Sequence, residues 1–172
     1  MKASAALVFC LACFACARQS GAGGTDALSA EGPAFAGGII PDEYACNGGN
    51  KFPPLKLGGI PAKAKSLAVI MDDPDSPSGT WLHLAAFNIA VSSAVLETAG
   101  APQGAVYGKN DFGNDRYDGP CPPSGTHRYV FHVCALDCIL LLEAGASRRD
   151  IESAMKGHIL ARGTLTAKYT KR

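Results

Sequence analysis

Three continuous apolar or aromatic runs predict the central strands of a sheet. They cover residues 66–71, 81–89 and 127–136. Short runs of this kind, bounded by stretches rich in Gly, Pro, Asn and Asp, are typical of strands covered on both faces. The third run is also rich in the aromatic and β-branched side chains that strands prefer. Residues 164–169 return to an alternating pattern and predict a last strand.

One segment predicts a helix, near residues 147–161. Ser147 and Asp150 have the spacing of a capping box, and apolar residues then recur at helical spacing as far as Ile159. We expect Gly163 to end this helix. Strands do not alternate regularly with helices along the chain, which disfavours a parallel α/β sheet and indicates a mostly β protein.

Composition adds a size class and excludes one class of partner. The chain has 172 residues, of which 47% are hydrophobic and 18% charged, as in a globular protein with one domain. Its net charge is +1, and no basic stripe marks a nucleic-acid face. We therefore expect no nucleic-acid partner.

The N-terminus predicts export. Residues 3–14 are almost wholly apolar and follow Lys2, which matches a signal peptide and is too short for a mature membrane span. Cys16 follows Ala15 in a way that resembles a bacterial lipoprotein signal, with Cys13 as the second candidate for lipidation. A plain cleaved signal peptide and a retained hydrophobic N-terminus are the alternatives.

These features divide the chain into three parts. We predict a signal peptide of lipoprotein type over residues 1–16, a flexible Gly/Ser-rich linker over 17–33 and a folded domain over 34–172. The mature protein would then be a lipoprotein of the cell envelope, anchored to a membrane on its periplasmic side.

Carboxylates follow the first predicted strand. Asp72, Asp73 and Asp75 stand where this buried run ends, so a rigid scaffold would hold them at the surface of the core. The alternative is a solvated turn, because Asp and Pro are common turn residues. The further oxygen ligands that a calcium loop needs are absent, so we predict no metal site here.

Two histidines lie where they could line a pocket. His83 and Trp81 point to one face of their predicted strand, and His127 and Tyr129 do the same on theirs. His83 alone would more often be a structural histidine. The loop before His127 contains three prolines and two glycines, which restrict its conformations. Mixed donors and acceptors beside a rigid wall favour a small phosphoester over a metal ion.

Taken in order, these motifs resemble one family. The runs Asp73-Pro74-Asp75-Ser76-Pro77, His83 and Gly119 to Tyr129 are similar to the signature regions of the phosphatidylethanolamine-binding proteins, also called Raf kinase inhibitor proteins, and above all of the bacterial branch. The resemblance implies an antiparallel β-sandwich with a few peripheral helices. It also implies a small anion pocket for phosphate or a phospholipid head group, with no cofactor. The pocket residues carried over are Asp73, Asp75, Trp81, His83, Pro122, Pro123, His127 and Tyr129.

Four cysteines follow the signal segment, and they allow three pairings. The layout of the family brings the loops of Cys46 and Cys121 towards one end of the sheet. We therefore hypothesise a disulfide between these two, which leaves Cys134 and Cys138 as buried thiols.

Three functions compete. The first is ligand binding through the anion pocket, and the second is inhibition of a protease or kinase through the pocket rim. The third is hydrolysis, with His83 or His127 as general base and Ser76 or Ser124 as nucleophile. Neither serine lies in a Gly-x-Ser-x-Gly elbow, so we expect the protein not to be an enzyme.

Overall fold

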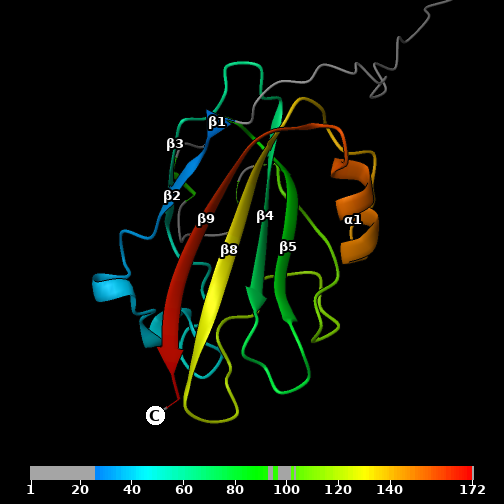
Figure 1. Ribbon diagram of the computed structural model, residues 1–172. Coiled ribbons are helices and arrows are strands. Elements are labelled where there is room, and N and C mark those ends of the chain that lie inside the picture. Colours follow the sequence, from blue (N-terminus) through cyan, green and yellow to red (C-terminus); the bar gives the residue numbers. More distant parts are fainter. Residues whose placement is uncertain (1–25, 93–94, 97–101, 103, 172) are drawn as a thin grey trace, which may run out of the picture.

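The computed structural model describes residues 26–92, 95–96, 102 and 104–171, and these form a two-layered β-sandwich with one α-helix (Figure 1). The elements are β1 (Asp26–Ala27), β2 (Ser29–Glu31), η1 (Ala36–Gly38), η2 (Asp42–Tyr44), β3 (Leu55–Gly58), β4 (Ser66–Asp73), β5 (Trp81–Ile89), β6 (Val95–Leu96), β7 (Val106–Tyr107), β8 (Thr126–Leu136), α1 (Arg148–Met155) and β9 (Ile159–Thr170). The 3₁₀ helices η1 and η2 are one turn each.

The large sheet has the strand order β1-β9-β8-β4-β5-β7, and the small sheet has the order β2-β3-β6. Neighbouring strands are antiparallel except for β1, which pairs parallel with β9. The three apolar runs are β4, β5 and β8, and β4 lies between the other two. Their prediction as central strands is confirmed, as is the mostly β fold class.

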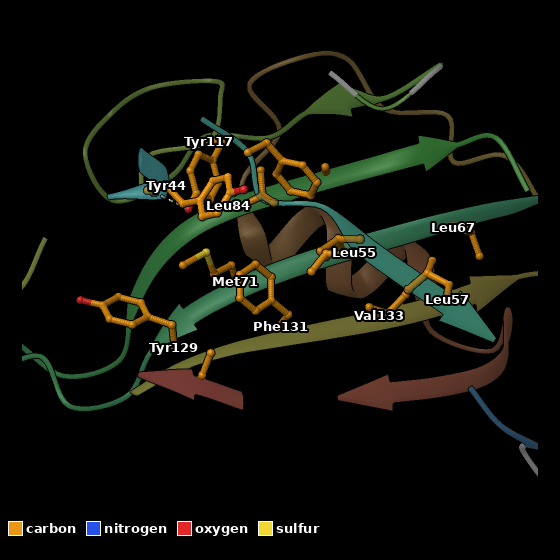
Figure 2. Packing of buried hydrophobic residues seen from close by; sticks show 14 of the residues in the cluster. Tyr44, Leu55, Leu57, Leu67, Met71, Leu84, Tyr117, Tyr129, Phe131 and Val133 are labelled. Atoms are coloured by element: carbon orange, nitrogen blue, oxygen red, sulfur yellow. Dashed lines mark hydrogen bonds between the residues drawn. The ribbon is translucent and has the colours of Figure 1, made fainter. Parts of the chain in front are cut away.

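The main core lies between the two sheets. Leu55 and Leu57 of β3 face Phe131 and Val133 of β8 across it, and Met71 of β4 is completely buried there (Figure 2). A second cluster lies on the other face of the large sheet, where Ile151 and Met155 of α1 cover it. Both faces of β4 are therefore buried, which explains its unbroken apolar sequence.

The helix begins as predicted but ends earlier. The Ser147 hydroxyl caps α1 by accepting a hydrogen bond from the backbone N–H of Asp150 at 3.2 Å and donates one to the Asp150 carboxylate at 2.6 Å. The helix ends at Met155, and β9 begins at Ile159 opposite Leu136. The predicted continuation to residue 161 and the stop at Gly163 are wrong. Apolar spacing around Ile159 fits a helix or a strand, and pairing with β8 decides between them.

Residues near the start of the described chain also differ from their prediction. The linker predicted for residues 17–33 is wrong from residue 26 on, because β1 pairs with β9 and β2 with β3. Leu28 between these two strands is only 4% exposed. The predicted signal peptide, with Cys13 and Cys16, lies outside the described residues. Within the described part of the chain, no helix is long and apolar enough to cross a membrane.

A β-bulge interrupts β5 near its start. The register with β4 pairs Met71 with Leu84 and Asp72 with Leu82, so His83 is an extra residue on β5. A bulge redirects the side chain of the extra residue away from the regular alternation of the strand. This local irregularity sets the direction in which His83 points.

Candidate functional site

The predicted pocket residues come together because of the sheet topology. Strand β4 ends at Asp73, whereas β5 begins at Trp81 and β8 begins at Thr126. Strand β4 lies between β5 and β8 and is antiparallel to both. The end of β4 and the starts of β5 and β8 therefore lie together at one end of the strands (Figure 1). Residues far apart in the sequence thereby form one site.

A buried aspartate–histidine pair lies at this end of the strands. His127 Nδ1 donates a hydrogen bond to Asp73 Oδ2 at 2.7 Å, and both side chains are almost fully buried. The other carboxylate oxygen of Asp73 accepts from the backbone N–H of Asp75 at 2.9 Å. Both carboxylate oxygens are therefore occupied, and the His127 ring is held with Nε2 available to a ligand.

His83 is fixed in one neutral form. Its Nδ1 lies 2.7 Å from the backbone oxygen of Asp118, and a carbonyl can only accept, so Nδ1 carries the proton. Burial lowers the pKa of His83 below its usual value, although the hydrogen bond to Asp118 and the charge of Asp73 oppose this shift. Near neutral pH the ring is therefore uncharged, with an unprotonated Nε2.

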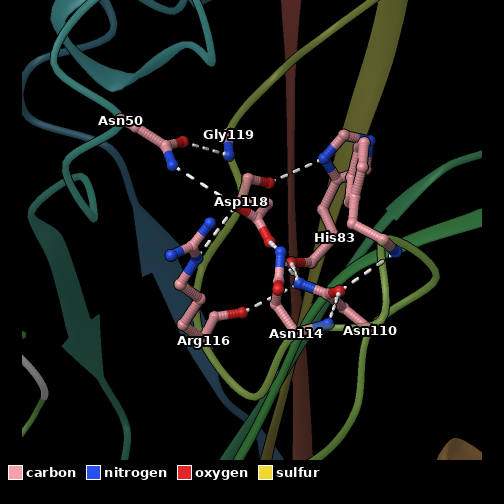
Figure 3. A network of polar contacts seen from close by, with 8 residues as sticks. Asn50, His83, Asn110, Asn114, Arg116, Asp118 and Gly119 are labelled. Atoms are coloured by element: carbon pink, nitrogen blue, oxygen red, sulfur yellow. Dashed lines mark hydrogen bonds and ion pairs between the residues drawn. The ribbon is translucent and has the colours of Figure 1, made fainter.

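A polar network holds the Asp118 segment in place (Figure 3). Its carboxylate accepts from Nδ2 of Asn110 and Nδ2 of Asn114, both at 2.8 Å, and from Asn50 at 3.3 Å. Burial alone would raise the pKa of Asp118, but these hydrogen bonds and the charge of Arg116 bring it below its usual value. The network supports the main chain that orients His83. None of these asparagines was predicted. Asn110 and Asn114 lie within eight residues of Asp118 in an irregular loop without a repeating pattern, and Asn50 contacts Asp118 from a loop 68 positions away.

Aromatic rings line the site in a row. The His83 ring lies 5.2 Å from both the Phe112 and Tyr129 rings, and the Phe112 ring lies 5.5 Å from Trp81. Phe112, which was not predicted, belongs to the loop between β7 and β8 and is 42% exposed. A phenylalanine among the polar residues 109–115 was the sequence signal that could have singled it out, although its contact with His83 appears only in the fold. We call Asp73, Trp81, His83, Phe112, His127 and Tyr129 the candidate pocket.

Two buried donors of the candidate pocket lack a hydrogen-bond partner. They are the Tyr129 hydroxyl and the Trp81 indole N–H. Among the described residues, no other buried side-chain nitrogen or oxygen lacks a hydrogen-bond partner. Asp73 and the Cys121 backbone lie near the hydroxyl without satisfying it, and burial together with the Asp73 charge raises the pKa of Tyr129. Unsatisfied buried donors are rare in folded proteins, and they mark places where a ligand could bind.

Asp75 has a different partner from the rest of the predicted set. Its carboxylate accepts from Arg128 Nη2 at 2.6 Å, Nε at 2.9 Å and the backbone N–H at 2.8 Å. The hydrogen bonds from Arg128 hold the pKa of Asp75 well below its usual range. Asp75 therefore joins the loop after β4 to the start of β8 on the exposed side.

The proline-rich loop is fixed at several points. Cys46 and Cys121 form a disulfide with Cα atoms 5.4 Å apart, and the Gly119 N–H donates to Asn50 Oδ1 at 2.7 Å. A Cβ at Gly119 would lie 2.0 Å from the Tyr44 oxygen, so only glycine fits there. Pro122 is buried, whereas Pro123 is exposed. Of the two prolines, Pro122 is the one placed to form a rigid wall.

A separate hollow lies on the other face of the large sheet. It has a volume of about 600 Å³ and lies between α1 and the strands, with Ile70, His132, Arg148, Met155 and Arg162 among its lining residues. It contains no residue of the candidate pocket. The candidate pocket is accordingly identified by its polar groups and not by the size of a cavity.

Similarity to known proteins decides the family. The family model described as phosphatidylethanolamine-binding protein matches residues 31–170. The chain belongs to the phosphatidylethanolamine-binding protein family. A UPF0098 protein of Methanothermobacter thermautotrophicus is 50% identical over 139 residues, which is 78% of this chain and 92% of that protein. One of Chlamydia muridarum is 42% identical over 136 residues, with 76% and 89% covered.

Solved structures of this family have the same fold. The crystal structure of a putative phosphatidylethanolamine-binding protein homologue from Chlamydia trachomatis superimposes with a TM-score of 0.80 at 37% identity, covering 85% of this chain and 99% of that one. YbcL of Escherichia coli, described as a member of the mammalian family, gives 0.76 at 29% identity, covering 86% and 100%. Membership in the phosphatidylethanolamine-binding protein family indicates ligand binding in general terms.

Proposed function

We propose that the candidate pocket binds a small phosphate-bearing anion of the phosphate or phosphoethanolamine type. The observation that carries this proposal is the pair of unsatisfied buried donors, the Tyr129 hydroxyl and the Trp81 indole N–H. Phosphate oxygens accept hydrogen bonds from such donors. The unprotonated Nε2 of His83 could accept the proton of a monoprotonated phosphate.

The charges of the pocket fit a partly protonated anion. The Asp73 carboxylate adds negative charge, but His127 and the Asp75 N–H already occupy its two oxygens. No Lys or Arg is in the candidate pocket, so the neutral donors and the rings supply the attraction. We therefore expect weak binding, in the millimolar to micromolar range, which corresponds to about 4 to 8 kcal/mol.

A second candidate function is inhibition of a protease or kinase through the rim of the pocket. The observation that favours it is Phe112, which is 42% exposed beside Trp81 and His83. Exposed aromatic side chains are common anchors in protein–protein interfaces. This function is compatible with phosphate binding, so a protease- and kinase-inhibition screen tests it separately.

We propose a binding protein and not a hydrolase. The Ser76 hydroxyl lies 3.4 Å from the backbone N–H of Ser78, at an exposed turn. Among the described residues, no hydrogen bond joins the hydroxyl of Ser76 or Ser124 to His83 or His127. A serine nucleophile needs such a bond to its base. The expected result is no turnover of a phosphomonoester.

We also propose that the protein is exported and attached to a membrane of the cell envelope by a lipid on Cys16 or Cys13. Support for export comes from the disulfide between Cys46 and Cys121, since disulfides persist in oxidising compartments. Mass spectrometry of the mature N-terminus tests the lipid, and a cleaved but unmodified N-terminus would contradict it.

Titration calorimetry with inorganic phosphate and with phosphoethanolamine tests the ligand. The informative variant is Tyr129→Phe, which removes one unsatisfied hydroxyl and keeps the ring against His83. A hydrogen bond to a charged group contributes about 1.5–3 kcal/mol, so we expect affinity to fall about tenfold to a hundredfold. The arm with phosphoethanolamine shows whether the amine adds to the binding.

Tyr107→Phe is the matched control, because Tyr107 lies on β7 outside the candidate pocket and is half-buried. It should bind phosphate like the unmodified chain. Undiminished binding by Tyr129→Phe, with the fold intact by circular dichroism, would show that phosphate does not use this pocket.

A further inference from the structure

Three potential metal ligands converge just beyond the end of β8. Asp137 and Cys138 follow that strand, and His158 precedes β9. A carboxylate oxygen, the thiol sulfur and an imidazole nitrogen of these residues all lie within 4.8 Å of one another. His158 Nδ1 and Asp137 Oδ1 are 2.9 Å apart. We call Asp137, Cys138 and His158 the thiol cluster.

We propose that the thiol cluster binds a divalent transition-metal ion, with Zn²⁺ as the best match. Zn²⁺ accepts sulfur, nitrogen and oxygen ligands at about 2.0–2.3 Å, and a tetrahedral ion separates its ligands by about 3.3–3.7 Å. Because the present separations do not exceed 4.8 Å, the adjustments needed are at most about 1.5 Å, within the reach of side-chain rotation. Binding of the ion releases the Cys138 thiol proton to solvent, and the resulting thiolate and the Asp137 carboxylate together balance the charge of the ion.

The backbone around the thiol cluster is already ordered without an ion. The Asp137 N–H donates to the His158 oxygen at 3.0 Å, and the Ser66 hydroxyl donates to the Cys138 oxygen. These contacts join three segments of the chain beside the β8–β9 pairing. A site preorganised in this way loses little conformational entropy when a metal ion binds.

The burial of the three side chains suits a site with one open position. Cys138 is 6% exposed and belongs to the second core cluster, whereas the Asp137 side chain is 43% exposed. The ion would enter from the Asp137 side, with the sulfur beneath it. Three protein ligands leave a fourth position for water or a small ligand, as in catalytic zinc sites.

The thiol cluster is distant from the candidate pocket. His127 stands near the first residue of β8 and Asp137 directly after its last, so they are separated by ten residues of extended chain, or about 30 Å. The metal-binding proposal and the phosphate-binding proposal therefore rest on different residues. Each can fail while the other holds.

Titration with Co²⁺ tests the metal site. Thiolate coordination to Co²⁺ produces a charge-transfer absorption band in the near ultraviolet, which neither carboxylate nor imidazole produces. The full chain is used with Cys10, Cys13 and Cys16 replaced by Ser, so that their thiols cannot contribute. We expect one equivalent of Co²⁺ to give the band and an excess of Zn²⁺ to remove it.

Cys138→Ser should abolish the band, and Asp137→Asn should weaken Co²⁺ binding at least about tenfold. Cys134→Ser is the matched control, because Cys134 is also a buried thiol of the second core cluster but lies outside the thiol cluster. It should keep the band unchanged. Absence of the band in the parent protein, or its survival in Cys138→Ser, would overturn the proposal.

Discussion

Two histidine–aspartate pairs stand at opposite ends of β8, and they differ in their surroundings more than in their geometry. His127 and Asp73 are 2.7 Å apart, and His158 and Asp137 are 2.9 Å apart. The Asp73 side chain is 4% exposed, whereas that of Asp137 is 43% exposed. The first pair lies beside aromatic rings and unsatisfied donors, and the second beside a thiol.

The groups around each pair predict what that pair binds. At the first pair, the available groups are neutral donors and an unprotonated imidazole nitrogen, which favour an anion that can also donate a proton. At the second pair, a thiol adds a ligand that soft and borderline metal ions prefer. Under the two proposals, the same two side-chain types therefore contribute to sites for opposite charges.

Removing the disulfide should have the largest effect, and it should act at the pocket end. The double variant Cys46→Ser, Cys121→Ser opens a link between residues 75 apart in sequence. Such a link contributes about 4 kcal/mol through the entropy of the unfolded chain. We expect urea unfolding to show a loss of this size.

The same double variant should also separate the two ends of β8. The loop that carries Pro122 and the Cys121 backbone would lose its fixed position, so phosphate affinity should fall. Co²⁺ binding at the thiol cluster, measured by the charge-transfer band, should not change. Equal weakening at both ends would show that the disulfide supports the whole sheet and not the pocket loop.

Matched substitutions of the two aspartates should give the next largest difference. Asp73→Asn removes the charge from a buried, doubly hydrogen-bonded carboxylate, which should lower the free energy of unfolding by about 2 to 3 kcal/mol. Asp137→Asn acts on a half-exposed pair, for which the expected loss is below about 1 kcal/mol. Urea unfolding of metal-free protein measures both losses. Similar losses in the two variants would contradict the prediction that the buried pair contributes more to stability than the half-exposed one.

The smallest effect should be a pH dependence that comes from His83. Because burial lowers the pKa of folded His83, the unfolded chain takes up the proton first as the pH falls through about 6.5. The free energy of unfolding therefore decreases below that pH, by at most about 1.4 kcal/mol per pH unit, until folded His83 also binds a proton.

His83→Gln removes this group and should flatten the profile between about pH 5 and 7. Unfolding curves of both proteins across that range provide the measurement. An equally steep profile in the variant would assign the pH dependence to other groups.

Much of the sheet and part of the candidate pocket could be predicted from the chain alone. Strand β4 has both faces buried, so its continuous apolar run was a clear signal. The alternation that places His127 and Tyr129 on one face, with Arg128 opposite, is a local property of a strand. The Ser147 cap likewise depends on residues only three positions apart.

Other features required the tertiary structure. The bulge that redirects His83 arises from the register between β4 and β5. The contact of Phe112 with His83 joins a loop to a strand, and the contact of Asn50 with Asp118 spans 68 positions. The ion pair of Asp75 with Arg128 could not be predicted either, because the two residues are 53 positions apart in sequence.

The amino-acid sequence by itself therefore determined the family, the central strands and the side chains available at the pocket. Those depend on local periodicity and on motifs read in order. Only the tertiary structure decided where α1 gives way to β9, which cysteines pair, and that Cys138 lies beside the Asp137–His158 pair. These outcomes depend on long-range strand pairing, which brings together groups that no local pattern connects.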